Sequence, residues 1–389
     1  MSSPDPLKIA IIGAGIGGLA AGALLARLGH AVSIYDQFAA PEPVGSGLVI
    51  QPVGQNVLGE IGVLDQALAL GTPVRRMIGG TGAARRVLDV TYDRSGIRFG
   101  LGIHRASLFD TLLRAARGAG ATLHPGHAAL SCADGHVSFA DHRAGPFDLI
   151  VDAAGAGSPL TSLKARALPF GAVWATVPWP GTTGLPRDVL SQRYEKASKM
   201  AGVLPIGRMP GSETPLAAIF WSLKATRYEN WRDTPLQRWK SDAATLWPAF
   251  APFLDTLNDH SNLTMARYSH GTLYRPNAPG IARIGDAAHQ ASPQLGQGAN
   301  MALLDALALA RAVDRHPLDR ALHTYARSRR VHMATYQLLS RFLTPLYQSD
   351  HWLPPLLRDQ VFAPLVAIPP VPRVLARLVS GDLVRPIRG

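Results

Sequence analysis

The start of the chain alternates short apolar runs with one longer helical stretch. The run Lys8 to Ile12 precedes a glycine-rich turn, and uncharged residues then continue to Ala26. Gly29 is placed to end this helix, and a second apolar run, Ala31 to Tyr35, follows it. The pattern predicts a strand, a turn, a helix and a strand, which form the first half of a doubly wound parallel sheet. The glycines and the change of period favour a buried strand and helix over a membrane span.

Later segments continue this pattern and then change it. Two further helices, Gly54 to Leu70 and Arg105 to Ala116, and a buried strand, Phe147 to Val151, fit the same sheet. From Gly171 onward, aromatic and β-branched runs separated by Pro/Gly turns predict strands of another layer. These runs are Ala172 to Val177, Gly202 to Leu204, Ala217 to Leu223 and Leu263 to Tyr268.

The chain is therefore predicted to be an α/β protein with a doubly wound, Rossmann-like domain, an inserted and mostly antiparallel sheet, and a helical tail. The strand Ile281 to Ile284 returns the chain to the first domain, and prolines beyond Tyr347 allow only short helices. We expect the first domain to comprise residues 1–75, 101–170 and 269–345. The inserted domain would comprise 76–100 and 171–268, and the tail 346–389.

Composition narrows the function. The chain has 389 residues, 47% of them hydrophobic and 17% charged, which fits a globular protein. Its formal charge of +12 comes from scattered arginines, so we expect no nucleic-acid partner. The single cysteine, Cys132, fits a reducing cytoplasm, and no Cys/His cluster has the spacing of a metal site. Redox chemistry would have to come from a bound cofactor.

A dinucleotide motif lies in the first turn. Gly13, Gly15 and Gly18 form the Gly-x-Gly-x-x-Gly pattern after a strand and at the start of a helix. Gly13 permits the tight turn, Gly15 lets a pyrophosphate approach the backbone, and Gly18 lets the helix pack closely on the strand. Asp36 ends the second strand, where it would bind a ribose hydroxyl. These residues alone do not separate FAD from NAD.

A second motif indicates a flavin. Asp286 ends the strand Ile281 to Ile284, where a carboxylate requires hydrogen-bond donors such as the hydroxyls of a ribityl chain. The helix that starts near Gly298 offers free N–H groups, which would stabilise negative charge on a reduced flavin. Gly296 and Gly298 keep the backbone open beside a flat ring.

At these residues the chain resembles the single-component (group A) FAD-dependent aromatic hydroxylases, the p-hydroxybenzoate hydroxylase-like family, over about residues 7 to 345. The resemblance implies that His104-Arg105 begins a helix from which Arg105 contacts the cofactor. It also implies that Gly45-Ser46-Gly47 and Gln51-Pro52 lie in a loop beside the flavin, although a plain turn is an alternative. The residues that it places around the flavin ring and ribityl are Asp286, Pro293, Gly296, Gln297, Gly298, Ala299 and Asn300.

The resemblance implies a reaction. An FAD monooxygenase would take electrons from NADPH or NADH, form a flavin C4a-hydroperoxide with O2, and hydroxylate an aromatic or similarly electron-rich small molecule. Pro293, Gly296 and Gln297 would form the environment of the ring, without a general acid or base. Two alternatives stay open: an FAD oxidoreductase of the same fold without oxygen insertion, and a protein that retains FAD without redox function.

The middle motif departs from the family pattern. The family has Gly-Ala-Asp-Gly here, whereas this chain has Ala154 in place of the acid, and Asp152 lies two residues upstream. The electron donor, NADPH or NADH, is therefore left open. His289 is interpreted as a residue that positions the loop beside Asp286.

The inserted layer and the tail supply the remaining predictions. Aromatic and basic side chains of the inserted layer are candidates for a substrate pocket: Arg193, Tyr194, Trp221 and Tyr268. The tail from Trp352 to Val384 alternates apolar residues and arginine, but its prolines break any long surface helix. Packing on the body or on a second subunit is favoured over membrane contact, and the protein is expected to be a monomer or a homodimer.

Overall fold

The computed structural model describes residues 6–40, 46–82, 85–93 and 95–388. A six-stranded sheet lies at its centre, in the order β18-β19-β12-β1-β2-β8, with every pair parallel except β18–β19. This arrangement confirms the predicted Rossmann-like domain. Its strands are β1 (Lys8–Ile12), β2 (Ala31–Tyr35), β8 (Thr122–His124), β12 (Leu149–Asp152), β18 (Asn277–Ala278) and β19 (Ile281–Arg283).

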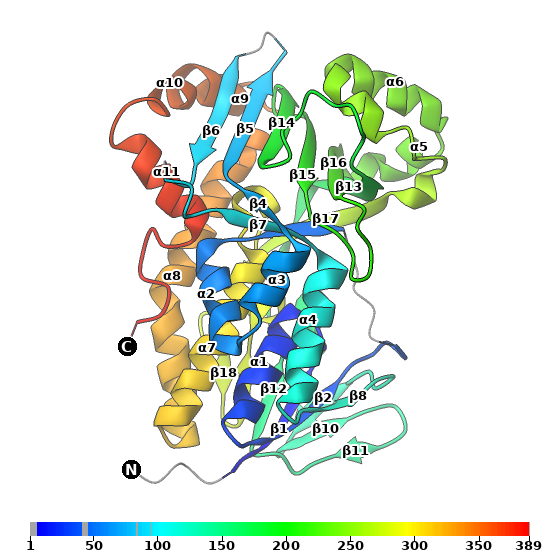
Figure 1. The fold of residues 1–389 in the computed structure, drawn as a ribbon. Coiled ribbons are helices and arrows are strands. Elements are labelled where there is room, and N and C mark those ends of the chain that lie inside the picture. The colour runs from blue at the N-terminus through cyan, green and yellow to red at the C-terminus, as the bar shows by residue number, and fades with distance from the viewer. Residues whose placement is uncertain (1–5, 41–45, 83–84, 94, 389) are drawn as a thin grey trace.

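Helices cover one face of this sheet (Figure 1). The largely uncharged α1 is buried over nearly its whole length between neighbouring helices, which explains its lack of a polar face. The other face is covered by the small antiparallel sheet of β9 (Ser131–Ala133), β10 (His136–Ser138) and β11 (Arg143–Ala144), through Val137 and Phe139. The covering helices are α1 (Ile16–Arg27), α4 (Arg105–Gly118), α7 (Gly298–Arg315) and α8 (Leu318–Tyr347).

The inserted layer is an eight-stranded sheet in the order β20-β17-β13-β16-β15-β14-β5-β6. All of its pairs are antiparallel except β14–β5, as expected for a mostly antiparallel insertion. Its strands are β5 (Arg76–Thr81), β6 (Arg86–Thr91), β13 (Arg166–Pro178), β14 (Val189–Glu195), β15 (Lys199–Pro205), β16 (Leu216–Lys224), β17 (Thr264–Thr272) and β20 (His289–Gln290). Strand β13 begins before residue 171 and β17 ends after residue 268, so this sheet extends past both expected limits of the inserted segment 171–268. The division of the chain into domains stays a prediction.

Two helices occupy the stretch predicted as one helix from Gly54 to Leu70. α2 (Pro52–Ile61) and α3 (Leu64–Leu70) are separated at Gly62, whose φ of 83° cannot continue a right-handed helix. A three-stranded sheet of β3 (Gly47–Ile50), β7 (Gly100–His104) and β4 (Thr72–Val74) lies between these helices and the inserted sheet. Helices α5 (Tyr228–Arg232) and α6 (Leu236–Leu246) cover the face of the eight-stranded sheet that is turned away from β3.

The tail folds into short helices, as its prolines predict. They are α9 (Leu353–Leu357), the π-turn η7 (Arg358–Phe362), α10 (Ala363–Leu365) and α11 (Val371–Ser380). The tail packs on the body: the Tyr336 hydroxyl donates to the carbonyl of Leu378 at 3.0 Å, and Arg98 pairs with Asp382 at 2.7 Å. Within the described ranges, no helix is both long and apolar enough to cross a membrane.

Candidate active site

A cavity of about 360 Å³ opens at the carboxyl ends of β1, β2 and β12. This is the edge of an open parallel sheet at which nucleotides bind. Four of the predicted cofactor-binding residues meet there: Gly13, Gly15, Asp36 and Arg105. The residues of the altered middle motif line its other side, including Ala154, Gly155 and Gly157.

The three motif glycines serve different purposes. A Cβ atom on Gly18 would lie 1.9 Å from the carbonyl oxygen of Gly13, so this glycine is required for helix α1 to pack on β1. Gly13 has a φ of 103° and would bring a Cβ within 2.5 Å of the Ala153 oxygen. A Cβ on Gly15, in contrast, would meet no atom within 4 Å. The space before the uncapped start of α1 is open, as an anion at a helix N-terminus requires.

Asp36 is held in a fixed orientation at the cavity. One of its carboxylate oxygens accepts from the backbone N–H of Ala14 at 2.7 Å, and the other accepts from Phe38 at 3.0 Å. A carboxylate still has free lone pairs after two such bonds, so Asp36 can also accept from a ribose hydroxyl.

Arg105 and Asp286 form the charged part of the site. Enclosure by protein lowers the pKa of Arg105 and raises the pKa of Asp286, and the attraction between the two charges opposes both shifts. His289 also acts to lower the pKa of the Asp286 carboxyl. Among the hydrogen bonds of the described residues, none reaches the Asp286 carboxylate. This group is therefore available to the hydroxyls of a ligand.

The first N–H groups of helix α7 have no helical partner, and the side chain of its N-cap residue does not accept from them either. Gly298 is exposed there, and a Cβ on it would meet no atom within 4 Å. Pro293 is also exposed, and Gly296 turns the backbone with a φ of 60°. These predicted ring-side residues form an open backbone surface with a partial positive charge.

Asn300 and Gln297 are buried and bind the protein itself. The amide oxygen of Asn300 accepts from the backbone N–H of Gln51 at 2.8 Å, and its nitrogen donates to Gly296 at 2.9 Å. Gln297 donates to the carbonyl of Val379 at 2.8 Å. Both side chains position the loop, and contact with a cofactor would use their backbone or that of Ala299 between them.

Gln51 carries an unsatisfied donor. Its amide oxygen accepts from the Tyr92 hydroxyl at 2.6 Å, while its amide nitrogen is buried and has no partner within the part of the chain that the structure describes. A Cβ on Gly296 would lie 3.3 Å from this nitrogen. A buried amide without an acceptor is costly, which fits a ligand beside this loop. Gly45, expected in the same loop, lies outside the described residues.

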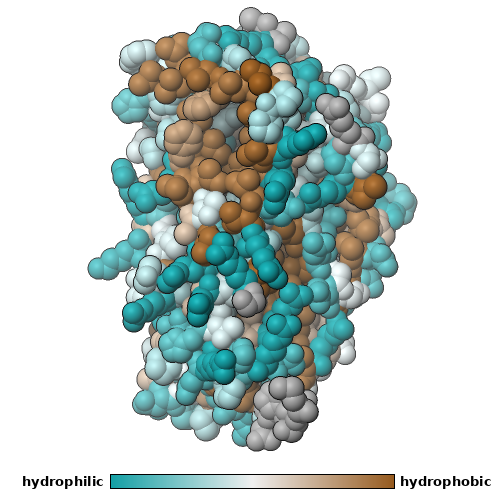
Figure 2. Space-filling model, turned by 90° about the vertical axis from the view of Figure 1, so that its left-hand side faces the viewer, coloured by the Kyte–Doolittle hydropathy of each residue, from teal (hydrophilic) through white to brown (hydrophobic). Residues whose placement is uncertain are grey.

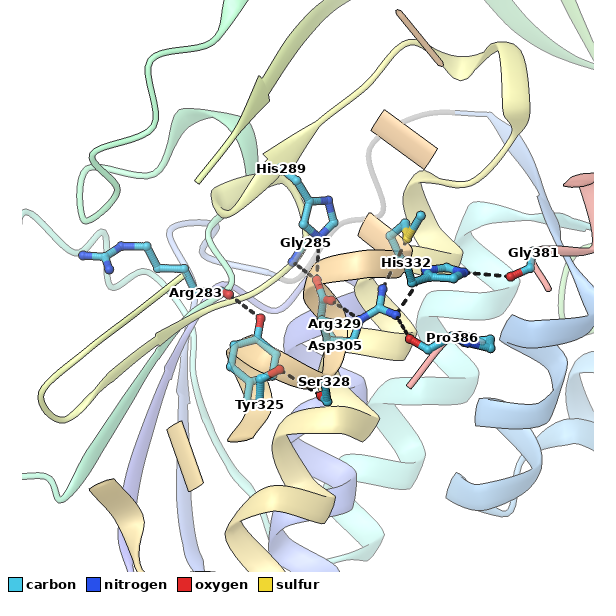
Figure 3. A network of polar contacts seen from close by, with 11 residues as sticks. Arg283, Gly285, His289, Asp305, Tyr325, Ser328, Arg329, His332, Gly381 and Pro386 are labelled. Atoms are coloured by element: carbon cyan, nitrogen blue, oxygen red, sulfur yellow. Dashed lines mark hydrogen bonds and ion pairs between the residues drawn. The ribbon is translucent and has the colours of Figure 1, made fainter. Parts of the chain in front are cut away.

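A buried polar network supports the loop before α7 (Figure 3). The Asp305 carboxylate accepts from the backbone N–H of Gly285 at 3.0 Å, and it pairs with His289 at 2.6 Å and with Arg329 at 2.8 Å. These partners hold the pKa of Asp305 down at about 2 against the effect of its burial. His289 thus fixes the loop through Asp305, a residue that the sequence analysis did not single out.

His332 extends this network to the tail. Its Nδ1 accepts from the Arg329 guanidinium at 3.2 Å, so the proton lies on Nε2, which donates to the carbonyl of Gly381 at 2.8 Å. Burial, followed by the Arg329 charge, lowers the pKa of His332 from 6.5 to about 4. Arg329 also donates to the carbonyl of Pro386. The network therefore ties α7 and α8 to the end of the chain.

The low pKa of His332 predicts acid sensitivity. Between pH 6.5 and 4, this histidine binds a proton in the unfolded chain but not in the folded one, so folding is destabilised as the pH falls. We expect His332→Gln, which can both accept and donate, to remove about 2 kcal/mol of the acid loss measured by urea unfolding between pH 7.5 and 4.5. His323→Gln, at an exposed position, is the control. Equal acid loss in the wild type and His332→Gln would contradict the assignment.

The altered middle motif is held by Asp152. Its carboxylate accepts from the Ser158 hydroxyl at 2.7 Å and from the Ala154 N–H at 3.2 Å, and burial raises its pKa. Gly155 and Gly157 then line the cavity with open space in front of them. Asp152 therefore holds the turn from Ala154 to Ser158 by hydrogen bonds from outside the cavity, and it does not replace the missing acid inside it.

The substrate-pocket candidates divide between two faces of the eight-stranded sheet. The outer face is covered by α5 and α6, and the inner face packs against β3. Arg193 and Trp221 both pair with Ala201, and this row lies on the outer face, where Trp221 packs against Trp239 of α6. Tyr194 lies on the inner face but is fully buried against Tyr347. We therefore assign Trp221 and Tyr194 to the core and Arg193 to the outer face, because alternation along the strands decides the side.

Tyr268 is the candidate that lies on the inner face and is partly accessible. Its hydroxyl accepts from the indole N–H of Trp174 at 3.0 Å, and burial raises its pKa to about 12. Trp174 also packs against Phe220, with 4.5 Å between ring centroids and an angle of 33° between the ring planes. The same face packs against Val49 of β3, next to the loop of Gln51. Trp174 was not among the candidates from the sequence, because nothing in its local pattern shows which face of β13 it occupies.

Comparisons with known proteins agree with this site. The FAD binding domain family matches residues 7–144 and 210–337. The kynurenine 3-monooxygenase of Stenotrophomonas maltophilia is 30% identical over 334 residues, covering 78% of this chain and 71% of the relative. The 6-hydroxynicotinate 3-monooxygenase of Bordetella bronchiseptica is 27% identical, covering 80% of this chain and 84% of the relative.

A solved structure shows the same fold. Klebsiella pneumoniae HpxO, solved with FAD and uric acid, matches with a TM-score of 0.76 at 20% identity, over 97% of this chain and 98% of that chain. The family match covers most of the present chain. Both relatives are monooxygenases, and the match to this chain covers most of the length of each. The chain therefore belongs to the group A FAD-dependent aromatic hydroxylases, and it is an FAD-dependent monooxygenase.

Proposed function

We propose that the chain hydroxylates a small aromatic molecule bound between the inner face of the eight-stranded sheet and the loop before α7. The observation that carries this proposal is the Trp174–Tyr268 pair. It places aromatic surface and one hydroxyl on the face that packs against β3, and β3 is bonded through Asn300 to the start of α7. A face that combines aromatic and aliphatic side chains with few polar groups suits a flat organic substrate.

The residues around the cofactor have distinct proposed roles. When bound, FAD supplies the redox chemistry with a nicotinamide nucleotide and O2. The free N–H groups at Gly298 and Ala299 favour negative charge on the ring edge, while Gly15 and Arg105 bind the pyrophosphate. Asp36 and Asp286 orient hydroxyl groups. Pro293, Gly296 and Gln297 shape the wall beside the ring and exclude water.

The test is oxygen-dependent oxidation of NADPH or NADH by FAD-loaded protein across a panel of phenols, anthranilates and hydroxylated pyridines. We expect at least one compound to accelerate the oxidation and to appear as its hydroxylated product. Nicotinamide oxidation that no aromatic compound changes would contradict the proposal. Running the assay with NADPH and with NADH in parallel also identifies the electron donor, while a monomer or a homodimer stays a prediction.

One variant pair tests the position of the substrate. Trp174→Phe removes the indole donor to Tyr268, and we expect KM for the aromatic substrate to rise by about tenfold while FAD affinity is unchanged. Trp221→Phe, the same change on the outer face, should leave KM unchanged and only lower the stability. Steady-state kinetics that show equal KM effects for both variants would contradict the assignment of faces.

A further inference from the structure

The tail helix of Leu353–Leu365 carries its apolar side chains on the outside. Four residues spaced four apart are exposed: Leu353 by 46%, Leu357 by 39%, Val361 by 47% and Leu365 by 40%. A surface helix of a globular protein normally turns such a stripe toward the core. Here the stripe faces away from the body of the chain, and Ile368, 52% exposed, continues it.

The opposite side of this helix is fixed by a buried arginine. Arg358 is 1% exposed, its guanidinium lies 4.9 Å from the ring centre of Tyr194 and 5.5 Å from that of Tyr347, and it donates to the Leu346 carbonyl at 3.1 Å. Rotating the helix to bury its leucines would remove these contacts and expose both rings. The inverted orientation is therefore built into the fold.

Neighbouring side chains enlarge the stripe into a patch. Phe342 of α8 is 57% exposed, and its ring centre lies 6.0 Å from that of Phe362. Trp352, at the start of α9, is 72% exposed. Figure 2 looks onto the side that is on the left in Figure 1, and it shows apolar surface gathered over the upper part of this side. A contiguous apolar patch of this kind marks an interaction site.

The charges around this tail patch that form no ion pair among the described residues are basic, whereas Asp350, two residues before Trp352, pairs with Lys224. Arg341 precedes Phe342, Arg373 follows Ile368 by a short turn, and Arg85 donates to Gln360 at 3.2 Å; all three are exposed and form no ion pair among the described residues. The one acid within residues 353–368, Asp359, is bonded to Arg358. A second copy would bring the same arginines and another formal charge of +12, whereas an anionic surface would be attracted.

We propose that the tail patch docks the protein onto the surface of an anionic lipid bilayer. The leucine stripe, Phe342 and Trp352 would lie at the boundary of headgroups and acyl chains, with the arginines on lipid phosphates. Trp352 suits this depth because its ring is apolar and its N–H is polar. The protein would lie on the membrane without crossing it. This proposal departs from the expectation that packing on the body or on a second subunit is favoured over membrane contact.

The experiment is flotation of the FAD-loaded, full-length protein with vesicles of phosphatidylglycerol and phosphatidylcholine, compared with vesicles of phosphatidylcholine alone. We expect binding to the anionic vesicles, with affinity falling as salt rises because screening shortens the reach of the arginines. Trp352 is an exposed tryptophan, so its emission should shift to the blue and lose sensitivity to iodide on binding. No binding to anionic vesicles, or equal binding to neutral ones at all salt concentrations, would overturn the proposal.

A matched pair of variants assigns the surface. The double change Leu353→Glu and Val361→Glu acts on exposed side chains, so the fold and FAD content should survive, and we expect vesicle affinity to fall by at least about tenfold. Leu130→Glu, exposed by 57% outside the patch, should bind vesicles as the wild type does. Unchanged vesicle binding by the double variant would overturn the proposal. A dimer in sedimentation that the double variant dissociates, without vesicle binding by the wild type, would assign the patch to a second copy instead.

Discussion

Replacing Gly15 with valine is expected to abolish FAD binding while leaving the apoprotein folded. No atom lies within 4 Å of the position of its Cβ, so the valine meets no clash in the protein. Its side chain would instead occupy the space before the start of α1 that we assign to the pyrophosphate. We expect affinity for FAD, measured by titration of the apoprotein, to fall by at least about 100-fold.

Two other glycines provide the controls for this experiment. Gly118→Val also meets no atom within 4 Å, but it lies at the end of α4 away from the cavity, so FAD affinity should stay at the wild-type level. Gly18→Val would collide with the carbonyl of Gly13 and should fail to fold. If Gly15→Val bound FAD normally, or unfolded as Gly18→Val does, the assignment of the cavity would be wrong.

Removal of the Asp305 carboxylate is expected to have the largest effect on stability. In Asp305→Ala, Arg329 keeps a buried positive charge without its partner, and the N–H of Gly285 loses its acceptor. Breaking a buried pair in this way costs about 3–5 kcal/mol, a large part of the stability of a typical domain. FAD affinity should fall as well, because the loop carrying Asp286 loses its anchor.

An exposed ion pair between α7, the helix that carries Asp305, and α2 supplies the comparison. Arg311 of α7 pairs with Glu60 at 2.8 Å, with both side chains more than 40% exposed, so Glu60→Ala should cost at most about 1 kcal/mol. Urea unfolding of the apoproteins measures both values. Similar losses for the two variants would show that the network of Asp305, His289 and Arg329 does not hold the loop.

Local patterns in the sequence predicted the fold well. A parallel sheet was predicted from the glycine motif, the apolar runs of β1 and β2, and the uncharged α1. Each of these patterns can be recognised within a few residues, because burial imposes it locally on the sequence. At Gly62 the prediction was wrong: the apolar period continues across this residue, while its left-handed backbone divides the helix in two. Strand β14 has Ser, Gln, Arg and Glu at four of its seven positions, so its sequence showed no clear strand pattern.

Side-chain partners could not be predicted in the same way. Trp221 and Trp174 are similar in sequence context, but the register of β16 and β13 puts them on opposite faces of one sheet. Asp305 is an ordinary helix residue in the sequence, and its importance depends on Arg329 and His289 from other elements. Arg358 similarly becomes an anchor only because its guanidinium lies over the rings of Tyr194 from β14 and Tyr347 from the end of α8.

The measurement that tests the central claim most directly is the mass of the product formed under isotopically labelled O2. FAD-loaded protein, a nicotinamide nucleotide and an aromatic compound that stimulates its oxidation are the only other components. As a monooxygenase, the protein should place one labelled oxygen atom in each hydroxylated product molecule, and no product should form without O2. An unlabelled product, or turnover that continues unchanged in the absence of oxygen, would contradict the account.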